Sequence, residues 1–255
     1  MQKALIGHTG FVGSNLLAQG RYAATFNSSS IGQIQGRRFD LVVCAGVSAV
    51  KWWANQHPQE DWRGIAGLID HLRTVVAAHF VLISTIDVYR DPVAVTEANR
   101  PDPEGLHPYG RNRLQLEDFV AENFARHSIV RLPGLFGPGL KKNIIFDMQH
   151  DNQLEVINPA SCFQWYPLAR IGRDIDAIVR AGAALVNLAT EPIETGEIHR
   201  RYFAGKPIGG RPAPAAAYDM RTTQPGLLGG AGDYHLARGE VLAALAQFLS
   251  EKGRP

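Results

Sequence analysis

The sequence opens on a short apolar run that leads directly into a glycine-rich turn. The run Lys3-Ala4-Leu5-Ile6 has the composition of a buried strand, and glycines follow it at positions 7, 10 and 13. An apolar pattern with helical spacing starts at the last of these glycines and continues through Leu17. A strand, a tight turn and a helix N-terminus in this order are typical of doubly wound α/β folds, in which the turn holds phosphate groups.

Each glycine of the turn has its own expected task. Gly7 lets the backbone turn sharply, Gly10 lets a pyrophosphate approach the main chain, and Gly13 lets the helix pack close to the strand. The free N–H groups and the dipole of the helix then face the phosphates. A plain turn is the alternative, because three spaced glycines alone are a weak signal. We predict that the turn binds a dinucleotide through Gly7, Thr9, Gly10, Phe11, Val12 and Gly13.

The residues that follow the second expected strand, over 22–26, bear on the choice of dinucleotide. Asn27 lies 20 residues past Gly7, where a dinucleotide site places the group that meets the adenosine ribose. An Asp there would favour NAD, whereas Asn27 and Ser28 can donate hydrogen bonds to a 2′-phosphate without repelling it. We therefore expect NADP in preference to NAD. A polar turn without a binding role is the alternative.

Apolar runs and helical patterns alternate through the first half of the chain. The runs expected to form buried strands are Phe39–Gly46, Phe80–Ile83 and Ser128–Leu132, separated by helical patterns over 58–77 and from Tyr109 onward. This alternation predicts a Rossmann-type doubly wound parallel sheet. Ligands bind outside the carboxyl ends of the strands of such a sheet, which brings Ala45, Gly46 and Thr85 to the expected site.

Beyond Gly139 the alternation loosens. Helices are expected over 143–150, 174–182 and 238–252, and strands over 154–157 and 185–188. Residues 205–233 are rich in Gly, Pro and Ala and are expected to form loop. We predict a Rossmann domain over residues 1–139, followed over 140–255 by a small substrate-binding lobe that also returns elements to the first domain.

Composition and charge exclude several classes of function. The 26 basic and 24 acidic residues give a formal net charge of +2, so there is no electrostatic case for binding nucleic acid or a membrane surface. The N-terminus enters an expected strand at once, so we expect no signal peptide. Cys44 and Cys162 match neither a metal spacing nor a disulfide framework. We expect reduced structural thiols, no metal site and a cytoplasmic protein.

Four motifs in order identify a family. They are Gly7-His8-Thr9-Gly10-Phe11-Val12-Gly13, Ser84-Thr85-Ile86-Asp87-Val88-Tyr89, Tyr109-Gly110-Arg111-Asn112-Arg113 and Arg131-Leu132-Pro133-Gly134-Leu135-Phe136-Gly137-Pro138-Gly139. Together they resemble the extended short-chain dehydrogenase/reductases, in particular the NAD-dependent epimerase/dehydratase family of nucleotide-sugar enzymes. The resemblance covers roughly residues 3–140 with motifs and the rest of the chain only by general layout.

The resemblance implies roles for particular residues. Members of the family use a Ser or Thr, a Tyr and a Lys, which places Thr85 at the hydroxyl position, Tyr109 at the acid/base position and Arg113 where the lysine stands. Pro133 and Gly134 match the turn that lies against the nicotinamide. A phenol with a pKa near 10 must be made more acidic to remove a hydroxyl proton near neutral pH, and a nearby cation favours that ionisation.

The chain departs from the family pattern in ways that bear on catalysis. Arg113 keeps the charge of the lysine and is expected to contact the cofactor ribose, but it cannot give up a proton. We expect Arg113→Lys to keep or raise activity; the alternative is that Arg113 anchors a ribose or an acidic neighbour. Asp61 stands where the family often has Asn. Asp87 supplies one acid where dehydratases carry an adjacent pair, which favours an epimerase or ketoreductase.

The sequence therefore predicts an NAD(P)-dependent oxidoreductase or epimerase that acts on a hydroxyl or ketone of a sugar, most simply a nucleotide sugar. The alternative is a non-catalytic NAD(P)-binding sensor or regulator of the same fold, which the loss of the lysine would favour. A homodimer is a possible assembly. Residues expected to contact the substrate, each with packing or a solvated loop as its alternative, are Ser48, Asp87, Asn143, Gln164, Tyr166 and Arg221.

The first prediction concerns the glycine turn. Gly10→Val should leave the protein folded but abolish cofactor binding, because the added side chain occupies the space that a pyrophosphate needs. Calorimetric titration of the native protein and the variant with NAD and NADP measures this directly. Unchanged affinity in a folded variant would contradict the assignment of the turn.

Overall fold

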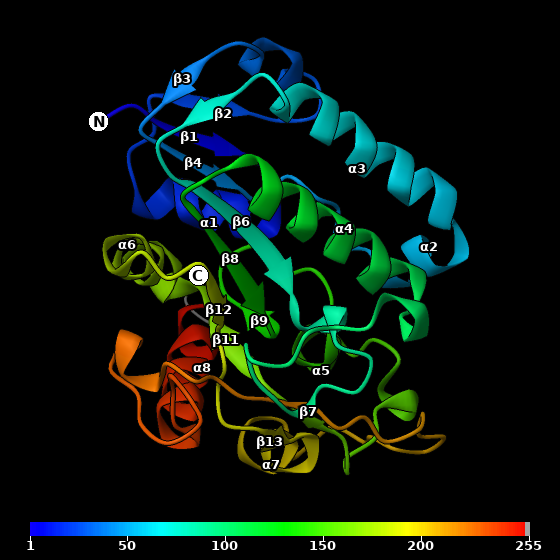
Figure 1. Ribbon diagram of the computed structural model, residues 1–255. Helices are drawn as coiled ribbons and strands as arrows, with labels where there is room; N and C mark the ends of the chain where they lie inside the picture. Colours follow the sequence, from blue (N-terminus) through cyan, green and yellow to red (C-terminus); the bar gives the residue numbers. More distant parts are fainter. Residues whose placement is uncertain (253–255) are drawn as a thin grey trace. The chain divides into compact units, whose positions relative to one another are not determined.

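The computed structural model describes residues 1–252, which divide into two compact units (Figure 1). The first unit consists of Met1–Arg90, Glu97–Leu132 and Arg170–Asn187. The second consists of Asp91–Thr96, Pro133–Ala169 and the chain from Leu188 onward. The segment 170–187 thus returns to the first unit after the chain has entered the second.

A six-stranded sheet forms the centre of the first unit. All of its strand pairs are parallel. In spatial order its strands are β12 (Leu185–Asn187), β8 (His127–Leu132), β6 (Phe80–Thr85), β4 (Leu41–Cys44), β1 (Lys3–Ile6) and β2 (Ala24–Phe26). The prediction of a Rossmann-type doubly wound parallel sheet is confirmed.

The direction of winding reverses next to β1. The chain passes from β1 to β2 on one side and then to β4 on the other side, after which each new strand adds beyond β4. In open α/β sheets such a reversal opens a crevice at the carboxyl ends of the strands, and ligands bind there. Gly7 follows β1 and Ala45 follows β4, so the glycine turn lies at this switch point.

Helices cover both faces of the sheet. On one face α3 (Pro58–Leu72) and α4 (Pro108–Asn123) lie side by side, and α2 (Lys51–Gln56) precedes α3 (Figure 1). On the other, α1 (Phe11–Gln19) and α6 (Ile171–Ala181) contact each other.

A continuous apolar core joins the sheet to α3 and α4. Every second strand residue points toward these helices because side chains alternate along a strand. Full burial of a large apolar side chain stabilises a fold by about 1.5–3 kcal/mol, so this core holds the two helices firmly on the sheet. Its members include Ala4, Ile6, Val42, Cys44, Phe80 and Leu82 from the strands and Ile65, Leu68, Leu72, Leu116, Phe119 and Val120 from the helices.

The second unit is built from short elements. Its strand pairs are β9 (Gly134–Phe136) with β11 (Trp165–Pro167), β10 (Cys162–Phe163) with β13 (Ile193–Glu194), and β7 (Val93–Val95) with β14 (Asp219–Met220). Its α-helices are α5 (Ile144–His150), α7 (Thr195–Tyr202) and α8 (Arg238–Lys252). Most of the segment 205–233 is irregular, as predicted, although it contains β14 and the short helix η6 (Pro225–Leu228).

Two expectations about local structure were wrong. Residues Leu154–Val156 form a 3₁₀ turn, η4, rather than a strand. Asp151 and Gln153 before it have positive φ angles of 55° and 48°, which turn the chain away from an extended path. The helix expected over 58–77 ends at Leu72, because residues Val76–Ala77 pair as β5 with β3 (Arg38–Phe39).

The remaining 3₁₀ turns connect the larger elements. They are η1 (Ile31–Ile34), η2 (Ile86–Val88), η3 (Pro103–Gly105) and η5 (Leu168–Arg170). Within residues 1–252, no helix combines the length and the apolar character needed to cross a lipid bilayer.

Candidate active site

The glycine turn brings the backbone of β1, α1 and β4 into close contact. Gly7 has a φ of +82°, and a Cβ on it would lie 2.3 Å from the carbonyl oxygen of Ala45. A Cβ on Gly13 would lie 2.0 Å from the carbonyl oxygen of Gly7. Both positions therefore require glycine for the close packing that the sequence predicted. Gly10 is different, because a Cβ there would approach only the Gly7 carbonyl, at 3.3 Å, so the space above it is open.

The N-terminus of α1 is suited to binding an anion. The helix has no side-chain cap and no acidic residue in its first turn. The first internal bond runs from the Ser14 N–H to the Gly10 carbonyl, so the N–H groups of Phe11, Val12 and Gly13 are not used within the helix. Unused N–H groups at the positive end of a helix dipole bind phosphate. The turn fits the pyrophosphate of a dinucleotide.

The loop after β2 folds around the side chain of Asn27. Its Oδ1 accepts hydrogen bonds from the backbone N–H groups of Ser29 and Ser30, at 3.1 and 3.2 Å, and from both hydroxyl groups, at 2.7 and 3.1 Å. Because the oxygen is occupied within the loop, the amide N–H₂ of Asn27 is the part that can donate to a ligand. This leaves Asn27 able to act as a donor, as the sequence predicted, and its contact with the ribose stays a prediction.

Sequence reasoning missed a cation beside this loop. The guanidinium carbon of Arg37 lies 5.5 Å from the ring centroid of Phe26, the residue directly before Asn27, and 5.0 Å from that of Phe39. Stacking on two rings holds the exposed arginine near the end of β2. The adjacent pair Arg37-Arg38 was the signal in the sequence, but nothing there showed that this segment passes beside Asn27.

The fold brings Thr85 and Tyr109 together. Thr85 ends β6 and Tyr109 is the second residue of α4, and the two side chains share a hydrogen bond. A Cβ on Gly110 would lie 2.0 Å from the carbonyl oxygen of Asp87, so glycine is needed for the first turn of α4 to approach η2. The backbone N–H of Tyr109 donates to Oδ1 of Asn55, at 3.0 Å, which also ties α4 to α2.

Arg113 makes a buried two-point ion pair with Asp61. Its Nη1 donates to Oδ2 of Asp61 at 2.5 Å and its Nη2 to Oδ1 at 2.8 Å. The two side chains are only 5% and 3% exposed. Asn112 donates a further hydrogen bond to Oδ2 of Asp61, at 2.8 Å. Asp61 on α3 therefore pairs with the charge of Arg113, the residue that was expected from the sequence to contact the cofactor ribose.

The same guanidinium group supports Tyr109. Its carbon lies 3.8 Å from the centroid of the Tyr109 ring, close enough for a cation–π interaction. Nη1 also donates to the Tyr109 carbonyl, at 3.1 Å, and Nη2 to the Ser48 carbonyl, at 2.6 Å. Because both Nη groups have partners within the fold, we treat Arg113 as a positioning residue for Tyr109. The expected contact with ribose is set aside.

Tyr109 is held in its neutral form. Burial raises the pKa of its phenol above the usual value, and the charge of Asp87 adds to the increase. Arg113, the hydrogen bond from Thr85 and the charge of Lys51 lower the pKa, but they offset the increase only in part. At neutral pH the group therefore carries a proton that it can donate.

Two charged or titratable groups near Tyr109 were not predicted. Lys51, at the start of α2, pairs with Asp87 at 2.7 Å between Nζ and Oδ1. His107 caps α4, with its Nδ1 accepting from the Gly110 N–H at 3.1 Å. Burial and the charge of Lys51 lower the pKa of His107. The Trp- and Gln-rich segment after β4 gave no periodic signal, so nothing in the sequence placed Lys51 against Asp87.

A buried polar network lies beside the site in the first unit. Arg131 on β8 pairs with Glu117 on α4 at 2.6 Å, and Glu117 also accepts a short hydrogen bond from Ser84. Arg131 donates to the hydroxyl of Tyr89 at 2.7 Å, and the amide of Asn187 on β12 donates to the same hydroxyl at 3.2 Å. The network joins α4 to the carboxyl ends of three adjacent strands.

The second unit places the other predicted residues in structural roles. The Gln164 amide donates to the carbonyls of Thr190 and Met220, at 2.5 and 2.7 Å, and accepts from the Met220 N–H at 2.7 Å. The Asn143 side chain accepts from two N–H groups at the start of α5 and donates to the Leu135 carbonyl. Their polar groups hold the fold, so we leave both out of the proposed substrate site.

Arg221, Tyr166 and Gly134 also have partners within the second unit. Arg221 pairs with Asp219 at 2.8 Å and with Asp233 at 3.1 Å. Tyr166 is 1% exposed, on β11. Its strand pairs with β9, where a Cβ on Gly134 would lie 2.8 Å from the Gln164 carbonyl oxygen. Pro133 precedes Gly134 directly, and the expected nicotinamide contact of these two residues stays a prediction.

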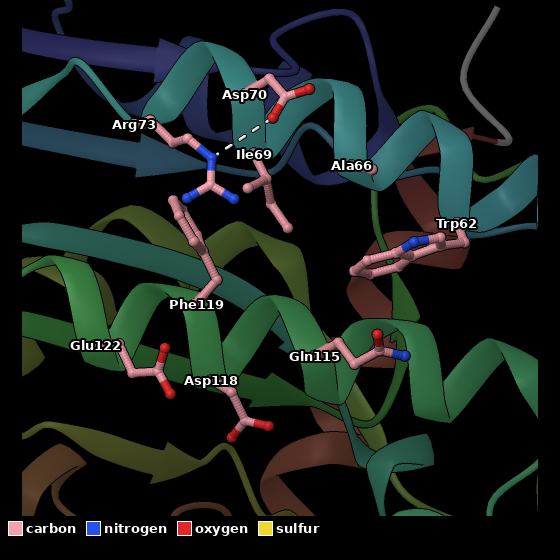
Figure 2. Close-up of a pocket in the computed structure, with 9 residues that line it drawn as sticks. All are labelled: Trp62, Ala66, Ile69, Asp70, Arg73, Gln115, Asp118, Phe119 and Glu122. Carbon is pink, nitrogen blue, oxygen red and sulfur yellow. Dashed lines mark ion pairs between the residues drawn. The ribbon is translucent and has the colours of Figure 1, made fainter.

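A groove of about 300 Å³ lies between α3 and α4 (Figure 2), and neither Thr85 nor Tyr109 is among the residues that line it. Trp62 and Phe119 line it from the two helices, and the guanidinium group of Arg73 lies 5.6 Å from the Phe119 ring centroid. Its other lining residues are Ala66, Ile69, Asp70, Gln115, Asp118 and Glu122.

Comparison with known proteins identifies the fold. No protein-family model matches the chain, and no curated protein matches it significantly in sequence. A dTDP-4-dehydrorhamnose reductase from Bacillus anthracis, solved in complex with NADP, has a TM-score of 0.77 at 18% identity, covering 98% of this chain and 99% of that chain. The dTDP-4-dehydrorhamnose reductase from Clostridium acetobutylicum has a TM-score of 0.76 at 15% identity, with full coverage of both chains.

An epimerase matches as well. UDP-glucose 4-epimerase from Thermotoga maritima, solved with UDP-glucose, has a TM-score of 0.73 at 15% identity, again with full coverage of both chains. The chain therefore shares the fold of these reductases and of this epimerase. The resemblance found from four motifs is confirmed at the level of the fold, including the part beyond residue 140 where no motif supported it.

The site predicts that Arg113 cannot be exchanged for lysine without loss. Arg113→Lys should lower the free energy of unfolding by about 1–3 kcal/mol and slow turnover, because one ammonium group cannot bridge both oxygens of Asp61 and reach the Ser48 carbonyl. This reverses the expectation from sequence. Arg111→Lys, an exposed change on the same helix, is the control. Urea unfolding and turnover that match the control would show that the two-point pair is dispensable.

Proposed function

We propose that this chain is an NAD(P)-dependent oxidoreductase that acts on a hydroxyl or ketone of a sugar, in particular of a nucleotide sugar. The observation that carries the proposal is the hydrogen-bonded pair Thr85 and Tyr109 at the carboxyl edge of a parallel sheet whose switch point holds an anion-ready glycine turn. Structural neighbours described as nucleotide-sugar reductases and epimerases, solved with NADP or UDP-glucose, support it.

Reduction of a carbonyl is the direction that suits Tyr109 best. Its raised pKa keeps the phenol protonated, so Tyr109 gives a proton to the substrate oxygen and becomes a phenolate. Thr85 holds that oxygen through its hydroxyl group. A reduced nicotinamide, when bound, supplies the hydride that the carbonyl carbon takes up. Arg113 keeps the Tyr109 ring in place against Asp61 and does not exchange a proton.

Cofactor contacts are proposed from the first unit. The turn residues from Gly7 to Gly13 would hold the pyrophosphate, and Ala45 and Gly46 would flank it across the switch point. Asn27 and Ser28 would meet the adenosine ribose. Arg37 supports NADP over NAD, because a cation near the end of β2 attracts a 2′-phosphate.

We propose fewer substrate contacts than the six that the sequence suggested. Ser48 and Asp87 belong to the same unit as Tyr109, and we keep them as candidate contacts. The second unit, which holds most of residues 140–255, is proposed as the substrate lobe. The two cysteines are free thiols, which agrees with a proposed cytoplasmic location.

We also propose that the chain forms a homodimer through the groove between α3 and α4 (Figure 2). The groove offers the apolar surfaces of Trp62 and Phe119. Arg73, directly after α3, pairs with Asp70 at 3.5 Å, and α4 contributes Asp118 and Glu122. In a two-fold dimer the same surface of each copy meets its counterpart, so the apolar side chains of the two grooves can pack against each other.

The proposed mechanism predicts that removal of the Tyr109 hydroxyl group has a large effect on turnover. Tyr109→Phe should lower turnover by roughly 10²–10⁴-fold, since it removes the proton donor, and should leave cofactor affinity almost unchanged. Reduction by the native protein should slow as pH rises through the pKa of Tyr109, because the donating form is lost. The measurement is oxidation of NADPH with a panel of keto nucleotide sugars, with Tyr202→Phe as the control, a phenol that donates to the Leu242 carbonyl.

Two outcomes of that experiment would contradict the proposal. An active protein whose rate is indifferent to Tyr109→Phe would remove the mechanism. A protein that binds NADPH but turns over no member of the panel would favour the alternative, a non-catalytic sensor that keeps the fold and the pocket.

The proposed choice of cofactor predicts a shift caused by one added charge. Asn27→Asp keeps the oxygen that accepts from Ser29 and Ser30, so the loop should keep its shape. The new carboxylate repels a 2′-phosphate, and the ratio of the dissociation constants should move toward NAD. Calorimetric titration with both dinucleotides measures the ratio. A native protein that already prefers NAD more than about tenfold, a difference of about 1.4 kcal/mol, would contradict the choice of NADP.

A further inference from the structure

A row of polar side chains crosses the central sheet one residue before Thr85. Ser84 on β6, Arg131 on β8 and Asn187 on β12 are register partners in the parallel ladder. All three are buried. Burying a polar or charged group is costly unless that group finds a partner. The row therefore has to be satisfied by the elements that cover this end of the sheet.

Glu117 on α4 binds two members of the row. Its Oε1 accepts a short hydrogen bond from the Ser84 hydroxyl group. Its carboxylate also accepts from Nε of Arg131 at 3.1 Å and from Nη2 at 2.6 Å. Glu117 lies on the same helix as Tyr109, and Ser84 directly precedes Thr85 on β6. The carboxylate therefore ties the helix that carries Tyr109 to the strand that carries Thr85.

Tyr89 binds the same arginine from the far end of the segment that follows Ser84. Its hydroxyl group accepts from Nη1 of Arg131 at 2.7 Å and from the amide of Asn187 at 3.2 Å. The guanidinium carbon of Arg131 lies 4.9 Å from the centroid of the Tyr89 ring. The segment 84–89, which contains Thr85 and η2, is thus bound at both ends to one buried ion pair. The residues that form this sheet-end network are Ser84, Tyr89, Glu117, Arg131 and Asn187.

The sheet-end network adds direction to a contact that apolar packing already makes. Leu116, Phe119 and Val120 of α4 pack against the sheet, but hydrophobic contacts are non-directional. Charge-assisted hydrogen bonds have defined lengths and angles, so they fix how far α4 slides or turns on β6. This matters for chemistry, because a misplacement of about 1 Å between reacting groups can slow a reaction by roughly a hundredfold.

We propose that the sheet-end network positions Thr85 relative to Tyr109. The proposal rests on the proposed function, in which these two side chains act on one substrate oxygen. No member of the network has to touch the substrate or exchange a proton. The role differs from that of Arg113 and Asp61, which join α4 to α3 and leave the strand that carries Thr85 unbound.

The chain offers a matched pair of variants for the test. Ser84→Ala removes a buried hydroxyl group from the network. Ser128→Ala, the control, removes one near the other end of the same sheet, where Ser128 on β8 donates to the Ala183 carbonyl at 2.6 Å. Both changes remove one buried hydrogen bond, so both should lower the urea midpoint to a similar extent. Only Ser84→Ala should affect Thr85.

Methyl NMR reads the position of Thr85 in the free protein. Threonine methyl groups are labelled with ¹³C, and the signal of Thr85 is identified by its loss in Thr85→Ser. Ser84→Ala and Tyr89→Phe should each broaden or split this signal, because each releases one end of the segment that contains Thr85. Ser128→Ala should leave the signal as narrow as in the native protein. A Thr85 signal that stays single and narrow in Ser84→Ala and Tyr89→Phe would overturn the proposal.

Turnover provides the second readout. Ser84→Ala should lower kcat for NADPH-dependent reduction by roughly ten- to a hundredfold, because Thr85 and Tyr109 no longer hold their relative positions. The affinity for NADPH should stay nearly unchanged, because the network does not include the glycine turn. A purely structural role would give Ser84→Ala and Ser128→Ala the same kcat, and that result would overturn the proposal.

The two readouts separate this proposal from the proposed function. If turnover depends on Tyr109 but is equal in Ser84→Ala and Ser128→Ala, the proposed function stands and the positioning role is rejected. If the native protein turns over no substrate, the proposed function is rejected. The NMR signal, which needs neither substrate nor cofactor, then still shows whether the network holds Thr85 in place.

Discussion

The site depends on one buried ion pair, between Arg113 on α4 and Asp61 on α3. Removing one partner of such a pair costs about 3–5 kcal/mol, because the other charge stays buried without compensation. The two helices that cover one face of the sheet are therefore joined at the residue on which Tyr109 packs. The position of the phenol follows from this link as much as from the helix that carries it.

This link has a chemical consequence. Arg113 lowers the pKa of the phenol through its charge, but it has no exchangeable proton, and Asp61 binds it at two points. Burial then dominates, and the pKa of Tyr109 rises. A protonated phenol held beside Thr85 is suited to donating a proton to a carbonyl oxygen.

The sequence allowed the sheet and the glycine turn to be predicted, because local patterns and the parallel topology decide them. That Thr85 and Tyr109 meet was implied by the resemblance to a family. The sequence could not reveal that Asp61 binds Arg113, since the partners are 52 residues apart and either could have faced solvent. The sequence also could not show the partners of Gln164: a polar side chain in an aromatic run suggests a ligand contact, but its amide donates to buried backbone carbonyls. The strand expected at 154–157 does not form, because the chain has positive φ angles just before it, and composition does not reveal such angles.

The central claim, that Arg113 and Asp61 act as one unit, is tested most directly by a double-mutant cycle in urea unfolding with Arg113→Met and Asp61→Ala. The account predicts that each single change lowers the free energy of unfolding by about 3–5 kcal/mol, and that the double variant loses less than the sum of the two, because no unpaired charge is then left in the interior. Losses that add to within about 0.5 kcal/mol would contradict it, since independent sites behave in that way.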